Sequence, residues 1–238
     1  MTSEPTPDRN PAHPAIRVLL GLVATGLDAA LLAIALGGIA PLLAHARALA
    51  LLALWAVGAV TLALLRPVRG HDAQSVERDP PFVLLALFLI PLLAPPVAAL
   101  GERLALWPLP GGAPLRWFGV VLSGAGLGVR IAAMAQLGSR FSPLLAVQRK
   151  HALETRGLYA RIRHPGYLGA LLAALGGALA FGSAVALPLV AAMGLLLWAR
   201  AGREETMLER HFGTAYVNYR ARSGRLLPRL APPRMPPA

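Results

Sequence analysis

Six apolar segments separated by polar connectors dominate this chain. They run over residues 16–40, 46–65, 81–100, 115–137, 165–181 and 184–200, and most are near or above the roughly 20 residues that a helix needs to cross a bilayer. Within lipid, a helix satisfies its own backbone polar groups. We therefore predict an all-α, polytopic transmembrane helical bundle of about six spans, whose last two spans form a short C-terminal hairpin turned at Gly182 and Ser183.

The basic residues are distributed unevenly over the connectors. Of the 23 Lys and Arg residues, 19 lie before or at the very start of the first span (Arg9 and Arg17), in the connectors 66–81 and 137–165, or from Arg200 onward. Three lie in the intervening connectors, and Arg130 lies within a span. Since Lys and Arg are enriched on the cytoplasmic side, we expect a multi-pass protein of a bacterial cytoplasmic membrane with both termini in the cytoplasm. Its basic face can contact the anionic headgroups of the lipid bilayer.

Several functional classes are disfavoured by the composition. The chain has no cysteine, and its six histidines never occur at the i, i+4 spacing of a helical zinc site, so we expect no metal. The basic residues are not interleaved with aromatic side chains that could stack on bases, so we expect no nucleic acid. We divide the chain into a disordered tail (1–14), a four-span region (15–136), a cofactor-binding and catalytic region (137–227) and a second disordered tail (228–238).

Two polar groups and a glycine run interrupt the apolar segments. A carboxylate within a membrane is costly, which makes Asp28 a site candidate; it can instead be a bundle-facing carboxyl that is bonded to another helix or is protonated. Arg130 lies about two turns before the end of its span, where it can snorkel to the surface or pair with Asp28. Gly124, Gly126 and Gly128 imitate a nucleotide-binding loop, but within an apolar helix they favour close helix packing.

A polar stretch meets the fifth apolar segment at the sequence RIRHPGYLG, residues 161–169. No charged residue follows between Leu168 and Trp198, so the junction is set against the membrane surface. Proline is favoured at the first position of a helix, which places His164 directly before helix amides that can bind an anion. Tyr159 and Tyr167 can stack on a ring or donate a hydrogen bond. The alternative is that Tyr167 and the neighbouring arginines only anchor the chain at the interface.

A second polar group lies at the inner mouth of the last span. Arg200 and Glu204 are four residues apart and therefore share one helix face. An arginine can bind a substrate carboxylate through two parallel hydrogen bonds, and a glutamate can offset a positive charge. Taken alone, the same spacing also fits a surface ion pair worth about 0.3 kcal/mol.

Read in order, four motifs resemble the isoprenylcysteine carboxyl methyltransferase family: RHPGYLG, R-x-x-x-E-E-x-x-L at 200–208, F-G-x-x-Y-x-x-Y at 212–219, and L-P at 227–228. The phospholipid methyltransferases and small-thiol methyltransferases are its relatives. The resemblance covers roughly the last hundred residues. It implies an integral-membrane methyltransferase whose cofactor is S-adenosyl-L-methionine.

Residue by residue, the resemblance implies a cofactor-binding set and a catalytic set. The cofactor-binding set is Gln148, His151, Ala152, Leu153, Glu154, Tyr159, His164, Pro165, Gly166 and Tyr167, and the catalytic set is Arg200, Glu204 and Glu205. Two positions depart from the family: its G-P-Y reads Gly157-Leu158-Tyr159 here, and Glu154 replaces an apolar residue, which can alter the rim of the cofactor site.

We therefore expect methyl transfer from the cytoplasmic side to a lipophilic acceptor, a prenylcysteine-type carboxylate, that enters from the bilayer. The alternatives are a phosphatidylethanolamine nitrogen or a small thiol as acceptor. More distant alternatives are a membrane sterol reductase that binds NADPH, or a non-enzymatic transport or scaffold protein whose basic face only binds lipid.

Overall fold

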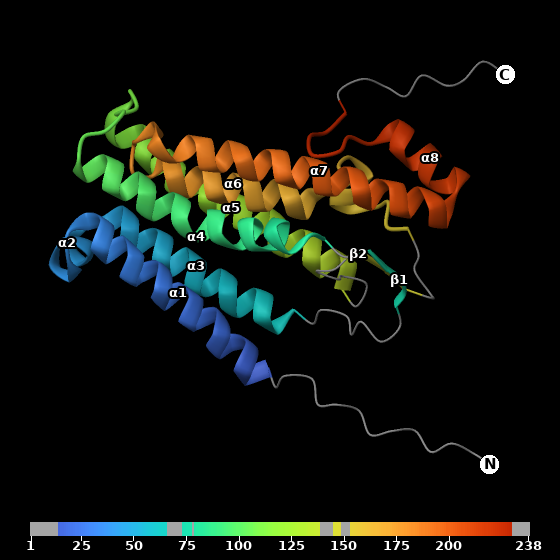
Figure 1. Ribbon diagram of the computed structural model, residues 1–238, viewed down its shortest axis with the longest axis horizontal. Coiled ribbons are helices and arrows are strands. Elements are labelled where there is room, and N and C mark those ends of the chain that lie inside the picture. The colour runs from blue at the N-terminus through green and yellow to red at the C-terminus, as the bar shows by residue number, and fades with distance from the viewer. Residues whose placement is uncertain (1–13, 66–72, 78, 139–144, 149–152, 230–238) are drawn as a thin grey trace, which may run out of the picture.

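The computed structural model describes residues 14–65, 73–77, 79–138, 145–148 and 153–229. Five of the described helices are long and apolar enough to cross a membrane. They are α1 (Pro14–Leu36), α3 (Ala46–Leu64), α4 (Pro81–Arg103), α5 (Gly112–Leu137) and α7 (Leu187–Phe212). The shorter α6 (Pro165–Leu179) is a sixth pass through the bundle (Figure 1). The predicted all-helical bundle of about six spans is confirmed.

Successive long helices run in opposite directions, so the bundle has two distinct ends (Figure 1). One end, called the α2 end, carries α2 (Ile39–Ala44), the α4–α5 loop and the α6–α7 turn. The other, called the α8 end, carries α8 (Thr214–Arg222) and a two-stranded antiparallel sheet of β1 (Ala73–Glu77) and β2 (Leu145–Gln148). The connector 66–81 between the second and third apolar segments thus contributes a strand. The predicted disordered tails lie almost entirely outside the described residues.

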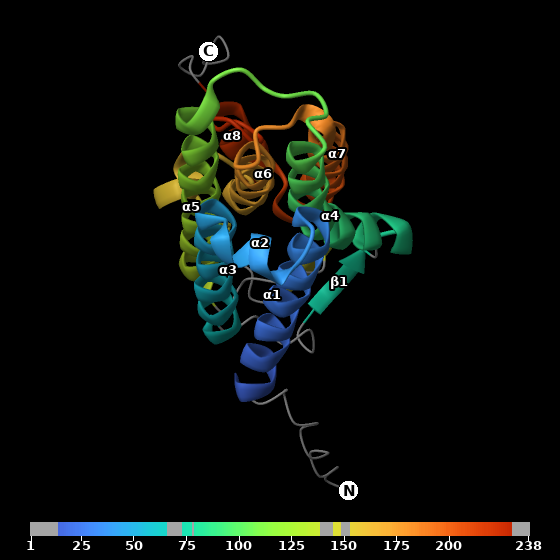
Figure 2. The same cartoon turned by 90° about the vertical axis from the view of Figure 1, so that its left-hand side faces the viewer.

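Helices α4 to α7 pack side by side, and α1 and α3 form a pair that leans away from them toward the α8 end (Figures 1 and 2). The buried apolar core is concentrated toward the α2 end and includes Leu32, Leu51, Ala98 and Phe181. Glu102 closes this end, since its carboxylate pairs with His45, Arg47 and Arg116 at 2.9–3.2 Å. The pairs join α3, α4 and α5 at the end where the helices converge.

The contact between α5 and α6 depends on glycine. A Cβ on Gly126 would lie 2.4 Å from the backbone nitrogen of Ala173, and one on Gly169 would lie 2.6 Å from the backbone nitrogen of Arg130. Such approaches leave no room for a side chain. Within the predicted packing run, Gly126 is therefore the residue that packs against α6, whereas a Cβ on Gly128 would meet nothing within 4 Å.

Two predicted helix boundaries are informative. The last helix was expected to continue past Arg200, and α7 does extend to Phe212. The third span contains three prolines, and α4 nevertheless runs from Pro81 to Arg103 with Pro91, Pro95 and Pro96 inside it. Neighbouring helices allow a membrane helix to accommodate the backbone groups that proline leaves free.

Candidate active site

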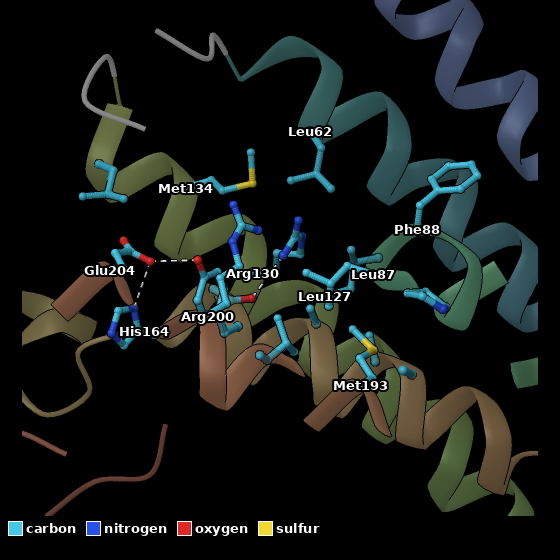
Figure 3. A pocket seen from close by; sticks show the side chains of 18 of the residues that line it. Leu62, Leu87, Phe88, Leu127, Arg130, Met134, His164, Met193, Arg200 and Glu204 are labelled. Carbon is cyan, nitrogen blue, oxygen red and sulfur yellow. Dashed lines mark hydrogen bonds and ion pairs between the residues drawn. The ribbon is translucent and has the colours of Figure 1, made fainter. Parts of the chain in front are cut away.

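A cavity of about 860 Å³ lies between the α1–α3 pair and helices α4 to α7. Toward the α8 end its wall is charged and aromatic, with Glu204, Arg200, His164 and Tyr167 (Figure 3). Along its length the wall is otherwise mostly apolar, formed by Leu20, Val23, Ala24, Leu27, Leu62, Leu87, Phe88, Pro91, Leu92, Leu127 and Met193. One continuous space therefore joins a polar site to an apolar channel.

Glu204 is the centre of the polar part. The Tyr167 hydroxyl donates a hydrogen bond of 2.7 Å to its Oε2, and His164 Nδ1 lies 3.5 Å from the same oxygen (Figure 3). The rings of His164 and Tyr167 stack with their centroids 5.2 Å apart. Glu204 comes from α7 whereas its two partners come from the start of α6, so the site depends on the hairpin that the sequence predicts.

The position of His164 follows from the local sequence. Pro165 begins α6, and the His164 carbonyl accepts hydrogen bonds from the amides of Tyr167 and Leu168. On the other side, the amides of Arg163 and His164 donate to the carbonyls of Gly224 and Arg225. The C-terminal segment thus pairs with the RHP motif and fixes the imidazole at the cavity wall.

Glu205 does not line the cavity and lies behind His164. Its side chain is only 3% exposed, and it pairs with Arg163 Nε at 2.8 Å, Arg225 Nη2 at 2.8 Å and His164 Nε2 at 3.3 Å. The resemblance grouped Glu205 with the catalytic residues. Its geometry is that of a buried counter-ion that orients His164 from the side opposite Glu204.

His164 therefore lies between two carboxylates. Burial lowers the pKa of its imidazole, but Glu204 and Glu205 raise it by more, so that the net pKa is above the ordinary value of 6.5. The charged imidazolium is favoured, and as a donor at both nitrogens it suits two acceptor carboxylates.

Arg200 lines the cavity, and its nearest acidic partner comes from outside the predicted site. Arg200 Nε lies 2.9 Å from Asp79 Oδ2, Arg203 Nη2 lies 2.8 Å from Asp79 Oδ1, and the Arg200 guanidinium lies 5.6 Å from the centre of the Tyr167 ring. Asp79 is buried, and it precedes α4 in a connector that looked merely solvated. Only its place just before a proline-initiated helix distinguished it in the sequence.

Arg130 and Asp28 both line the cavity, but at different depths. Arg130 donates to the carbonyl of Gly166 at 3.2 Å. A Cβ on Gly21 of α1 would contact Ala59 of α3, and a Cβ on Gly58 of α3 would contact Leu127 of α5. These residues therefore lie at about the same height along the axis of the bundle. With a rise of about 1.5 Å per residue, Asp28 lies roughly 10 Å toward the α2 end and Arg130 roughly 5 Å toward the α8 end. That separation excludes the suggested ion pair.

The remaining cofactor-binding predictions fall into three groups. Leu153, Glu154, Tyr159 and Gly166 line the cavity, and Pro165 is buried beside it. Gln148 lies in β2, where only its backbone pairing with Ala73 is described. His151 and Ala152 lie outside the described residues.

Two tyrosines of the F-G-x-x-Y-x-x-Y motif also line the cavity, and sequence reasoning did not include them. Tyr216 is completely buried, and the Tyr219 hydroxyl donates to the Tyr159 carbonyl at 2.7 Å. The Tyr159 hydroxyl in turn lies 3.4 Å from the Ala133 carbonyl. The main contribution of Tyr159 to the cavity wall is therefore the face of its ring. The tyrosine spacing in the motif was the signal that could have identified them.

Fold and site together define a class: a multi-pass helical membrane protein with a charged pocket open to an apolar channel. The sequence model of the isoprenylcysteine carboxyl methyltransferase family matches residues 118–210, which contain α6 and most of α5 and α7. This segment of the chain is therefore similar to that family.

Relatives with curated names agree with the match. A protein-S-isoprenylcysteine O-methyltransferase of Schizosaccharomyces pombe is 39% identical over 98 residues, which are 39% of this chain and 40% of the relative. A protein-S-isoprenylcysteine O-methyltransferase A of Arabidopsis thaliana is 30% identical over 108 residues, 43% of this chain and 53% of the relative. The chain thus spans about half or less of the length of these relatives.

A solved structure of a eukaryotic intramembrane Ras methyltransferase, isoprenylcysteine carboxyl methyltransferase, has a similar fold. The TM-score is 0.52 at 20% sequence identity, with 76% of this chain and 67% of the other covered. The likeness extends to the membrane helices outside the family match.

Proposed function

We propose that this protein is an S-adenosylmethionine-dependent methyltransferase that methylates the carboxylate of a lipophilic acceptor of prenylcysteine type. The observation that carries the proposal is the single cavity of about 860 Å³, in which Glu204, His164 and Arg200 share a wall with an apolar channel. A cofactor with a polar body and an acceptor with a long apolar tail need such a two-part space.

The residues at the polar end suit S-adenosylmethionine. Glu204 supplies negative charge for a sulfonium, the ring of Tyr159 offers a face for adenine, and the start of α6 at Gly166 can receive a carboxylate. Leu153 and Glu154 form the rim. When bound, the cofactor would supply an electrophilic methyl group on its sulfonium.

The acceptor side is supported by the charge of the wall. Arg200 and Arg130 are cationic groups at the border between the polar and apolar parts, where the carboxylate of an acceptor with a buried tail would lie. Arg200 is held by Asp79 and by Tyr167, which restricts its orientation. A fixed guanidinium can orient a carboxylate oxygen and supply part of the rate through positioning alone.

Among the lining residues that the structure describes, His164 and Glu204 are both poorly suited to act as a general base, which favours a carboxylate acceptor over an amine or a thiol. A carboxylate oxygen is already deprotonated, whereas an amine or thiol must lose a proton. Glu204 and Glu205 raise the pKa of His164 and so favour its charged form, and Glu204 already accepts a hydrogen bond from Tyr167. We therefore assign positioning, charge compensation and exclusion of water to these residues.

Methyl transfer from labelled S-adenosylmethionine tests the proposal. Purified protein is offered a prenylcysteine analogue, phosphatidylethanolamine and a small thiol in parallel, and the product is treated with base, which releases the methyl group only from an ester. We expect base-labile product from the prenylcysteine analogue. Transfer only to the amine or the thiol, or to none of the three, would refute the assignment.

We propose further that the α8 end faces the cytoplasm. The basic residues of α8 and of the segment after it lie there, as the enrichment of Lys and Arg on cytoplasmic surfaces requires. Accessibility of single cysteines introduced at exposed positions of α8, such as Arg222→Cys, would test this in sealed cells.

A further inference from the structure

Asp28 is an ionisable residue in the apolar part of the cavity, and the site described above does not use it. It lines the same space as Glu204 and Arg200, and the lining residues nearest to it in α1 are the apolar Ala24 and Leu27. Among the residues that the structure describes, none forms a hydrogen bond or ion pair with its carboxyl group. The bundle-bonded carboxyl that the sequence allowed is therefore not realised in the described part of the chain.

Nearby polar groups are already engaged or too distant. The Trp55 indole nitrogen lies 3.4 Å from the Ser123 hydroxyl, its hydrogen-bond acceptor. Arg130 bonds to Gly166, roughly 15 Å from Asp28 along the helix axes. In the described part of the wall, the donors Trp55 and Arg130 thus bond to other groups and not to the Asp28 carboxyl.

Its depth places Asp28 at the inner part of the channel. A Cβ on Gly177 would contact both Pro95 and Trp55, so α6 is packed against these two residues here and closes the space. An acceptor whose reacting carboxylate lies beside Arg200 would bring the far part of its tail to this region. Asp28 would then face the distal end of the acceptor rather than its reacting end.

A partly buried carboxyl in an apolar channel, such as that of Asp28, favours ligands that offer it a hydrogen-bond donor. An all-hydrocarbon tail would displace water from the carboxyl and leave it without a partner, whereas a hydroxyl or ammonium group at the same place would donate to it. A site with a polar group to satisfy discriminates strongly against an analogue that lacks the matching group.

We propose that Asp28 is a specificity-determining residue that accepts a hydrogen bond from a hydroxyl or ammonium group at the distal end of the lipophilic acceptor. The inference rests on the proposed function, since the acceptor must place its reacting end beside Arg200. It extends that function because it states that the acceptor carries a second polar group, at the end of its tail that is remote from the methylated carboxylate.

Two S-alkylcysteine acceptors of equal tail length, one ending in methyl and one in hydroxyl, test the proposal. kcat/KM is measured for each with the wild type, Asp28→Leu, and the control Thr25→Val. Thr25 is one turn away on α1, bonds to the Gly21 carbonyl and does not line the cavity. We expect the wild type and Thr25→Val to prefer the hydroxyl acceptor by about tenfold or more, and Asp28→Leu to lose or reverse that preference.

Binding without turnover separates failure of this inference from failure of the proposed function. Affinities of both labelled acceptors are measured in the presence of S-adenosylhomocysteine. If no acceptor is methylated, a hydroxyl preference in binding that vanishes in Asp28→Leu still supports the role of Asp28. Equal use of the two acceptors by the wild type, or a preference that Asp28→Leu retains, would overturn it.

Discussion

Replacing Glu205 by Gln removes one negative charge from the most enclosed ionic cluster of the α8 end. The carboxylate is 3% exposed and lies within 3.3 Å of Arg163, Arg225 and His164, whose side chains are 9%, 25% and 5% exposed. Removing one partner from a buried ion pair costs about 3–5 kcal/mol, because the remaining charge is left uncompensated. Arg225 can regain water and Arg163 keeps its bonds to the carbonyls of Arg220 and Ser223, so we expect a value near the lower limit, about 3 kcal/mol.

Glu209 provides a matched control one turn further along α7. It pairs with Arg220, but both side chains are more than a third exposed, and an exposed pair contributes at most about 1 kcal/mol. For a chain of this length about 1 kcal/mol corresponds to a shift in Tm of roughly 2–4 °C. Thermal unfolding in detergent, followed by tryptophan fluorescence, should therefore show Glu205→Gln lower by roughly 6–12 °C. A loss no larger than that of Glu209→Gln would refute the assigned role of the buried cluster.

Three further predictions concern other parts of the fold and site. The raised pKa of His164 stabilises the fold fully below the unfolded pKa of 6.5, and this stabilisation is lost as the pH rises through the pKa of the folded state. His164→Gln should therefore flatten this part of a plot of Tm against pH. An unchanged slope would contradict the assigned charge state. Gly126→Ala should lower stability by at least about 1–3 kcal/mol because its methyl group would meet the α6 backbone, whereas Gly128→Ala should be nearly neutral; equal melting temperatures would count against the α5–α6 contact. Arg200→Ala should lower kcat/KM for the acceptor about 10–100-fold while affinity for S-adenosylhomocysteine stays within threefold, and parallel losses in both would argue against an acceptor role.

The bundle could be predicted from the sequence because each span is a local pattern. Apolar length sets the six passes, Pro165 sets the start of α6, and Gly182 allows the turn with a φ of +63°. The i, i+4 spacing of Arg200 and Glu204 put both on one face of α7, and both do line the cavity.

Long-range partners could not be predicted in the same way. Asp79 is more than a hundred residues from Arg200 in the chain, and no periodicity connects the two. Likewise, nothing around Glu205 shows that Arg225 from the C-terminal segment will neutralise it. Adjacent residues on a helix point in different directions. Glu204 therefore faces the cavity whereas Glu205 faces the ionic cluster, and the sequence does not show which side of α7 meets which.

We propose that Glu204 faces the sulfonium of a methyl donor bound in the polar part of the cavity. S-adenosylmethionine carries that positive charge and S-adenosylhomocysteine does not, so calorimetric titration of both into wild type and Glu204→Gln isolates the interaction. We expect one saturable site per chain, with the substitution weakening the binding of S-adenosylmethionine by about tenfold more than that of S-adenosylhomocysteine, which corresponds to about 1.4 kcal/mol. Equal changes for the two ligands, or no saturable binding of either, would contradict it.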